Sequence, residues 1–221
     1  LFNGSCFICT RSVKDRTEIL DDPSISRISR GELKDRPLPF LSDDSIAEAF
    51  DLIYKLRING DSVGGQVEAC ITGVPPGWGE PFFDSLESSI AHLVFSIPGI
   101  KALEFGAGTE FSGMKGSQAN DPWITDGNQI RTKYNNSGGI NGGISNGMPI
   151  RFKVTFRPTP SIRMPQDTVN LMTGKASVLE IRGRHDPCVV PRACPVVEAI
   201  AAMALMEALL DQQIQTNEAW R

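Results

Sequence analysis

The segment from residue 183 to residue 212 reads GRHDPCVVPRACPVVEAIAAMALMEALLDQ, and it contains the longest helix that the sequence predicts. Pro195 precedes residues that are apolar on almost every side of this helix, which we expect to run from 196 to about 212. Proline is favourable at the first position of a helix, because the N–H that it lacks would have no partner there. Glu198 and Glu207 interrupt the apolar run, so the helix is expected in a core or an interface rather than in a membrane.

The segments before this helix predict strands. Alternation of apolar and polar residues with period 2 predicts a strand over residues 149–157, and further strands are expected at 1–13, 65–72 and 177–182. The charged, proline-containing stretch 15–41 is interpreted as a long surface connection.

Two shorter helices are also predicted. Ser42 is the expected N-cap of the first, whose apolar stripe consists of Ile46, Phe50, Ile53 and Leu56. Asp84 and Glu87 resemble a capping box that opens the second, which passes through Leu86, Ile90, Leu93 and Val94. Segregated strands and helices with short connections favour an α+β fold.

The composition favours a globular protein. Its 221 residues are 40% hydrophobic and 22% charged, and we expect a single domain over residues 1–221. The net charge of −4 opposes binding to nucleic acid, and no uninterrupted apolar run reaches the roughly 18–20 residues that cross a membrane. Five cysteines, an odd number, indicate a reducing compartment, so a cytoplasmic location is expected.

Two short motifs have ordinary structural interpretations. Cys6 and Cys9 form a CxxC without a second pair at zinc-ligand spacing, so we interpret them as two small buried side chains and expect no metal site. Residues 60–65, GDSVGG, resemble the nucleophile loop of a serine hydrolase built on Ser62. A glycine-rich turn between a helix and a strand explains this motif better, because Val63 disrupts the loop that would form an oxyanion hole.

The glycine distribution is unusual. Eleven of the 21 glycines lie between residues 99 and 147, which we interpret as too dense for regular structure. Residues 134–147, YNNSGGINGGISNG, contain paired glycines that would allow a backbone to approach a ligand closely, and we expect this run to form part of a site.

Two polar segments offer chemistry suited to an anion. Residues 157–161, RPTPS, place a guanidinium and two hydroxyl groups at the end of a predicted strand, a combination that suits phosphate. Residues 182–188, RGRHDPC, place two arginines, a histidine and an aspartate directly before the long helix. Without family knowledge, these features predict a phosphate-capable site on an α+β domain and do not name a reaction.

Five runs of the sequence together resemble the chorismate synthase family. They occur in the same order as in that family, from about Arg57 to the C-terminus. They are GDSVGG at 60–65, SIPGIKALEFGAG at 96–108, MKGSQANDP at 114–122, SGGINGGISNG at 137–147 and GRHDPCVVPRACPVVEAI at 183–200.

The resemblance implies a lyase of the shikimate pathway, in aromatic amino acid biosynthesis. Such an enzyme eliminates phosphate from 5-enolpyruvylshikimate 3-phosphate in a 1,4-anti sense to give chorismate. It requires reduced FMN, although the reaction has no net redox change. The family fold is an α+β sandwich of antiparallel sheets and helices, and homotetramers are common.

The resemblance also assigns residue roles. Asp186 and Arg184 correspond to catalytic positions, with Asp186 handling a proton near the flavin and Arg184 also reaching the substrate. The expected flavin contacts are Pro98, Gly99, Gly142, Arg157, Pro158, Thr159, Pro160, Ser161 and Arg184. Arg157 stands where the family commonly has Lys, and either cation can hold a phosphate.

The family's N-terminal third, with two histidines thought to act as acids, has no counterpart in this chain, which starts with Leu1. We therefore expect the fold to be truncated at its N-terminus and the chain to be inactive alone. The alternative is a non-catalytic fragment that binds flavin or phosphate.

Overall fold

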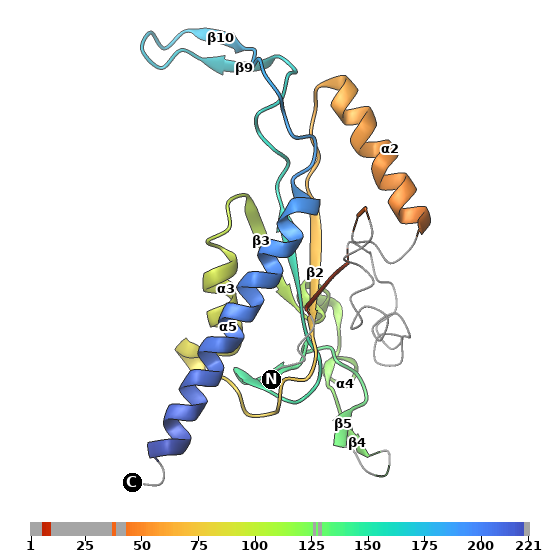
Figure 1. The fold of residues 1–221 in the computed structure, drawn as a ribbon, viewed down its shortest axis with the longest axis vertical. Helices are drawn as coiled ribbons and strands as arrows, with labels where there is room; N and C mark the ends of the chain where they lie inside the picture. Colours follow the sequence, from red (N-terminus) through yellow and green to blue (C-terminus); the bar gives the residue numbers. More distant parts are fainter. Residues whose placement is uncertain (1–5, 10–36, 39–42, 126, 128–129, 219–221) are drawn as a thin grey trace.

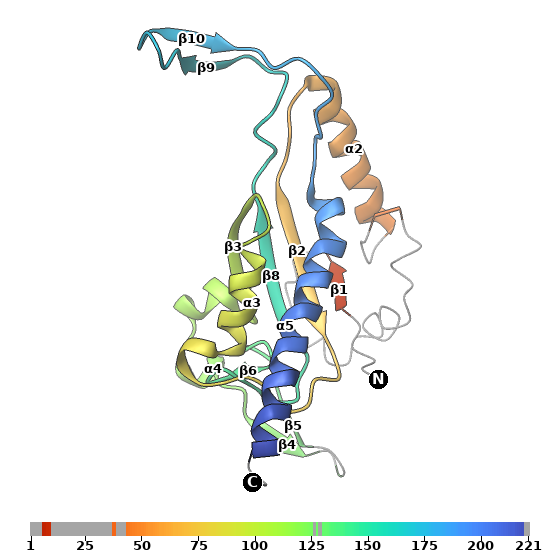
Figure 2. The same ribbon diagram turned by 60° about the vertical axis from the view of Figure 1, so that its left-hand side comes forward.

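A computed structural model describes residues 6–9, 37–38, 43–125, 127 and 130–218 of the chain. Its main element is a four-stranded antiparallel sheet with the strand order β1-β2-β8-β3. Helices α3 and α5 lie against one face of this sheet, as Figures 1 and 2 show. The strands of the sheet are β1 (Cys6–Cys9), β2 (Gly65–Ile71), β3 (Ile100–Phe105) and β8 (Ile150–Phe156).

Other elements surround the sheet and the two helices that lie against it. The helices are α2 (Asp43–Asn59), α3 (Leu86–Val94), α4 (Gly116–Ala119) and α5 (Val190–Glu218), with short 3₁₀ helices at Phe82–Asp84 and Gly108–Gly113. Three hairpins pair β4 (Trp123–Thr125) with β5 (Ile130–Thr132), β6 (Ile140–Asn141) with β7 (Ile144–Ser145), and β9 (Gln166–Val169) with β10 (Ala176–Leu179).

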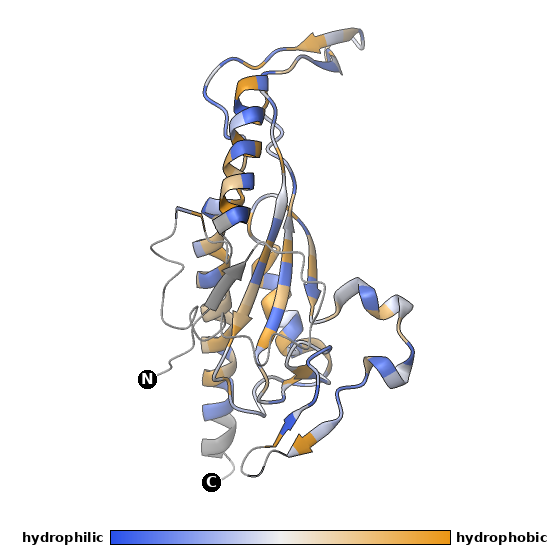
Figure 3. Ribbon diagram, turned by 90° about the vertical axis from the view of Figure 1, so that its right-hand side faces the viewer, coloured by the Kyte–Doolittle hydropathy of each residue, from blue (hydrophilic) through white to orange (hydrophobic). Residues whose placement is uncertain are grey.

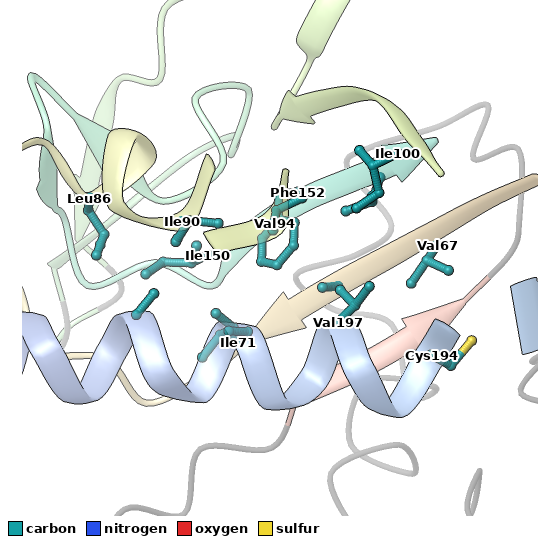
Figure 4. Packing of buried hydrophobic residues seen from close by; sticks show 14 of the residues in the cluster. Val67, Ile71, Leu86, Ile90, Val94, Ile100, Ile150, Phe152, Cys194 and Val197 are labelled. Atoms are coloured by element: carbon teal, nitrogen blue, oxygen red, sulfur yellow. The ribbon is translucent and has the colours of Figure 1, made fainter. Parts of the chain in front are cut away.

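The core lies between the sheet and α5. The alternate residues Ile150, Phe152 and Val154 of β8 are at most 1% exposed, and so is Val197 on the facing side of α5. Figure 4 shows Ile150, Phe152 and Val197 meeting between the helix and the strands. Small residues of α5, Ala201 among them, complete this buried side and let the helix approach the sheet closely.

The opposite face of the sheet is polar. Arg151 of β8 forms an ion pair with Glu68 of β2, and Lys153 lies 3.8 Å from Glu104 of β3. Figure 3 shows the colours along these strands changing between apolar and polar residues. The period-2 pattern that predicted the strand at 149–157 therefore corresponds to one face of the sheet that is buried against α5 and one face that is polar.

Helix α5 begins earlier than predicted. The carbonyl of Val189 accepts the N–H groups of Arg192 and Ala193 at 3.1 Å, so Pro191 lies in the first turn and Pro195 lies inside the helix. The predicted start at Pro195 was wrong, because an earlier proline already occupies the favoured place.

By length and composition alone, residues Val190–Gln213 could cross a membrane, with a mean hydropathy of 1.8. In the structure one side of this helix packs on the sheet, and a core helix passes the same test.

Two further predictions need correction. Helix α3 is capped by Ser85, whose hydroxyl accepts the N–H of Ser88 at 3.1 Å, whereas Asp84 belongs to the preceding 3₁₀ helix. The glycine-rich span was not too dense for regular structure, because it contains β3, which pairs with β8 over most of its length. Strand β3 was missed since its stability depends on a distant partner rather than on a local pattern.

The remaining expectations are confirmed in part. Strands β1, β2 and β8 fall within predicted ranges, while most of the predicted connection 15–41, the N-cap Ser42 and the side chains of Cys6 and Cys9 lie outside the described residues. The strand predicted at 177–182 is β10, which ends at Leu179 and pairs with β9 in a hairpin that projects from one end of the molecule (Figure 1). The stripe of α2 is only half-buried at Ile46, and Phe50 is exposed.

Candidate functional site

Three segments that are far apart in the sequence meet at one end of the sheet. They are the turn 60–65 between α2 and β2, the extension 157–163 that follows β8, and the loop 181–188 that precedes α5. We call residues 60–65, 157–163 and 181–188 the three-segment cluster. Two of the five sequence runs contribute to it, and hydrogen bonds join every pair of segments.

The turn 60–65 packs directly on the backbone of the extension. The hydroxyl of Ser62 donates to the carbonyl of Thr159 at 2.7 Å. A Cβ at Gly64 would lie 2.3 Å from the carbonyl oxygen of Phe156, so only glycine allows this approach. The Ser62 hydroxyl is thus bound to a carbonyl rather than to a histidine, which opposes the serine hydrolase hypothesis and supports the glycine-rich turn.

Residues 157–161 continue straight from β8 into the cluster. The N–H of Arg157 donates to the carbonyl of Gly99 at 2.9 Å, which brings Gly99 and its neighbour Pro98 beside this segment. Arg157 is exposed, and it forms no ion pair with another described residue. Pro158 and Pro160 are exposed and Thr159 is half-buried. The guanidinium is therefore available to an external anion.

Ser161 is joined to His185 of the loop. The Ser161 Oγ and His185 Nδ1 atoms are 3.0 Å apart, and His185 Nε2 lies 3.2 Å from the carbonyl oxygen of Ile181. A carbonyl can only accept, so Nε2 carries the hydrogen, and in a neutral ring Nδ1 must accept from the Ser161 hydroxyl. Both side chains belong to half-buried residues.

Asp186 is held in place by its own loop and by α5. Its carboxylate accepts the N–H of Cys188 at 3.2 Å through Oδ1 and forms an ion pair with Arg192 through Oδ2. The carbonyl of Pro187 accepts the N–H of Val63 at 2.9 Å, which fixes the loop on the turn 60–65. Arg184 is exposed and forms no ion pair with a described residue. The loop thus presents an oriented carboxylate beside a free cation.

An apolar groove of about 130 Å³ adjoins the cluster. One wall is α2 with Leu52 and Ile53, and the opposite wall is the start of α5 with Val190 and Cys194. Burial raises the pKa of the Cys188 thiol, which also lines the groove. A cluster that carries exposed guanidinium groups and also borders an apolar groove is suited to a ligand that has both a flat apolar part and an anionic part.

Gly142 is not part of this cluster. It forms the two-residue turn of the β6–β7 hairpin with Gly143, whose carbonyl accepts the N–H of Leu86 at 2.9 Å. This hairpin lies near the start of β8, whereas the cluster follows its end, as Figure 2 shows for β6 and β8. The structure therefore brings together Pro98, Gly99, residues 157–161, Arg184 and Asp186, and places Gly142 at the other end of the strand.

The sequence did not single out two residues that hold the cluster together. Arg163 donates through its N–H to the carbonyl of Gly60 at 2.8 Å, and its guanidinium lies 3.4 Å from the carbonyl of Gly183. Arg192 orients Asp186. Arg163 lies two residues after Ser161, and Arg192 lies six residues after Asp186. This closeness in the sequence to predicted site residues was the signal that could have identified them. Across the described ranges, no three His, Cys, Asp or Glu residues gather as metal ligands, and His92 is exposed on α3.

The antiparallel sheet covered by helices, with a cation-bearing cluster at one end, defines an α+β protein with a site suited to an anionic ligand. A crystal structure of a chorismate synthase has this fold, with a TM-score of 0.73 and 28% identity over 95% of this chain and 57% of that chain. The sequence profile of the family described as chorismate synthase matches residues 8–210. The chain belongs to the chorismate synthase family, and the predicted α+β fold and resemblance are confirmed.

Curated relatives agree with this assignment. A chorismate synthase from Methanocella arvoryzae is 51% identical over 154 residues, which are 70% of this chain and 41% of that protein. Another, from Methylacidiphilum infernorum, is 42% identical over 194 residues, which are 88% of this chain and 52% of that protein. The chain thus spans about half the length of these relatives.

Proposed function

We propose that the chain is part of an enzyme that forms chorismate by 1,4-anti-elimination of phosphate from 5-enolpyruvylshikimate 3-phosphate, with reduced FMN as cofactor. Family membership and the names of its relatives support the reaction. The observation that carries the proposal is the convergence of the three-segment cluster, which brings the exposed Arg157 and Arg184 to one end of the sheet and shares Val63, Gly64 and Cys188 with an apolar groove. We further propose that the enzyme acts in the cytoplasm and forms homotetramers.

The donor set of the cluster fits FMN. Arg157 and the hydroxyl of Ser161 suit the phosphate, since a guanidinium and a hydroxyl both donate hydrogen bonds to its oxygens. The backbone at Pro98 and Gly99 would contact the same ligand, and Gly142 stays a predicted contact. When bound, reduced FMN would supply electron density for cleavage of the C–O bond, and it would regain that density with loss of the C–H bond, so the reaction has no net redox change.

The remaining steps belong to the chain itself. Arg184 would bind substrate and flavin anions beside the loop 181–188. Asp186, fixed by the N–H of Cys188 and by Arg192, would accept or return a proton at its carboxylate. The apolar groove would exclude water from the reacting atoms.

We expect the 221-residue chain to bind FMN without completing the reaction. It contains two histidines, His92 and His185, and neither corresponds to the two that the family is thought to use as acids. The second candidate, a non-catalytic fragment that binds flavin or phosphate, predicts the same binding.

The decisive experiment is a titration of the purified chain with FMN, followed by flavin fluorescence. Arg184→Ala should weaken binding by roughly ten- to a hundredfold, because it removes a charge-assisted hydrogen bond to the ligand. Lys175→Ala, which removes a cation from the projecting hairpin, is the matched control and should change the affinity less than twofold.

Absence of FMN binding by the wild-type chain would overturn a preformed flavin site. The two candidates are separated by an anaerobic assay with reduced FMN and 5-enolpyruvylshikimate 3-phosphate. For this assay the chain is mixed with a polypeptide that contains the N-terminal third of the family and its two histidines. Formation of chorismate supports the enzyme, and binding without turnover in that mixture supports the fragment.

A further inference from the structure

We propose that His185 is a positioning residue whose protonation decides whether the Ser161 hydroxyl can donate a hydrogen bond to a phosphate monoester. The inference rests on the proposed function, because it concerns the same cluster. It adds that binding of the ligand is coupled to the uptake of one proton. His185 would not touch the ligand, since its two ring nitrogens are both occupied by protein groups.

The hydrogen bonds of the ring define two states. With a neutral ring, Nε2–H donates to the carbonyl of Ile181, Nδ1 accepts from Ser161, and the Ser161 hydrogen therefore points toward the histidine. With an imidazolium, Nδ1–H donates to Ser161 Oγ at the same 3.0 Å separation, and the hydroxyl hydrogen is released toward another acceptor. The heavy atoms need not move between the states.

A phosphate monoester favours the second state. Its terminal oxygens only accept hydrogen bonds when it is a dianion, so a Ser161 hydroxyl directed at His185 would leave one of them without a donor. Binding of phosphate and uptake of one proton by His185 are then linked, and each strengthens the other.

The charges around the ring agree with this sign of the linkage. Arg184 and Asp186 flank His185 on its own loop, and Asp186 is neutralised by Arg192 of α5. Arg157 and Arg163 lie on the facing extension, and Asp61 lies on the turn 60–65. A phosphate dianion bound beside the ring would add negative charge there, and negative charge favours an imidazolium.

The phosphate has two possible sources of identical chemistry, the FMN phosphate and the 3-phosphate of the substrate. Both are monoesters that titrate near neutral pH. Riboflavin, which lacks the phosphate, and shikimate 3-phosphate, which lacks the flavin, separate the two sources.

The test is the affinity of the full chain for FMN, riboflavin and shikimate 3-phosphate at pH 7.0 and 8.5. For the wild type, at least one of the two phosphate ligands should bind about tenfold more weakly at pH 8.5, since one charge-assisted hydrogen bond is lost. The step should fall below twofold in His185→Gln, which keeps a donor for Ile181 but does not titrate, and in Ser161→Ala. Riboflavin should show no step.

The chain has two histidines, so a ¹⁵N spectrum of its imidazole rings gives a direct readout with the exposed His92 as internal reference. At pH 7.5 the His185 signals should change from the neutral Nε2–H form to the imidazolium when shikimate 3-phosphate or FMN saturates the chain. The His92 signals should stay unchanged.

The outcomes distinguish this inference from the proposed function. Binding of a phosphate ligand with equal pH dependence in wild type, His185→Gln and Ser161→Ala overturns the inference alone, as does a neutral His185 in the saturated chain. Absence of any binding by the wild type overturns both. If His185→Gln fails to fold by circular dichroism, Ser161→Ala and the spectrum of the wild type still decide.

Discussion

The two ends of strand β8 carry different kinds of sequence signal. At its start lie residues 138–147, where glycines allow backbones to touch; at its end lies the three-segment cluster, where polar side chains join distant loops. A Cβ at Gly106 would lie 1.9 Å from the carbonyl oxygen of Asn136, and one at Gly143 would lie 2.3 Å from that of Glu80. Glycine density at the start therefore reflects close packing, whereas available cations mark the cluster.

The motifs near the start of β8 also contact one another. The carboxylate of Asp121, in the run 114–122, accepts the N–H groups of Asn136 and Ser137 at 2.8 Å. These hydrogen bonds join two of the five family runs, 114–122 and 137–147, and their role within the described part of the chain is to hold the fold together. Substitutions at this end should reduce folding stability, while substitutions in the cluster should reduce ligand binding.

The largest effect is expected for Gly138→Ala. Gly138 has φ +67°, and a Cβ there would lie 2.5 Å from the backbone nitrogen of Gly106 and 2.7 Å from the carbonyl oxygen of Arg151. The variant has both left-handed strain and a backbone clash, so it should lose more than about 4 kcal/mol of unfolding free energy. Urea denaturation followed by circular dichroism measures this. A loss under 1 kcal/mol would show that close packing does not explain the glycine.

The second prediction concerns Arg157→Ala. The side chain is exposed and pairs with no described residue, so unfolding free energy should change by less than about 0.5 kcal/mol. FMN affinity should fall by roughly tenfold or more, because a cation on the phosphate is lost. Isothermal titration with FMN and with riboflavin checks this. Equal losses for both ligands would mean that Arg157 does not contact the phosphate.

The comparison shows what the sequence could predict. Strands β2 and β8 follow from local sequence patterns, since one face of each is buried, whereas α5 is apolar on almost every side and its sequence does not show which side faces the core. The hydrogen bond between Ser62 and Thr159 joins residues 97 positions apart, and no local pattern predicts such a contact. The segments of the cluster were recognised separately by their residue types, and the fold was needed to show that they meet and that Gly142 lies elsewhere.

The third prediction concerns β2, which runs between the two ends. Burial raises the pKa of the Cys70 thiol from 9.0 to about 12, with the Arg151 charge lowering it and the Glu68 charge raising it. The thiol thus stays neutral in the fold while it ionises in the unfolded chain above pH 9, so stability is lost as pH rises. Between pH 8 and pH 10 the wild type should lose about 1.4 kcal/mol more than Cys70→Ala.

Urea denaturation of both proteins at the two pH values measures this difference. A disulfide-exchange reagent offers a second check, since Cys70 should react only at the rate of unfolding. Equal alkaline losses in the two proteins would mean that the thiol is accessible to water in the folded state.

The smallest effect is expected for Gly142→Ala, the matched partner of Gly138→Ala. Its φ of +61° is close to that of Gly138, but a Cβ at Gly142 would have no neighbour within 4 Å. The variant has the left-handed strain alone and should lose about 1 kcal/mol of unfolding free energy. The FMN affinity of the same variant tests the proposed contact, and a change below twofold would remove Gly142 from the flavin site. A tenfold weaker affinity with unchanged stability would instead give Gly142 the flavin contact that family resemblance assigns to it, and would require a ligand that reaches both ends of β8 or a second chain that brings the ends together.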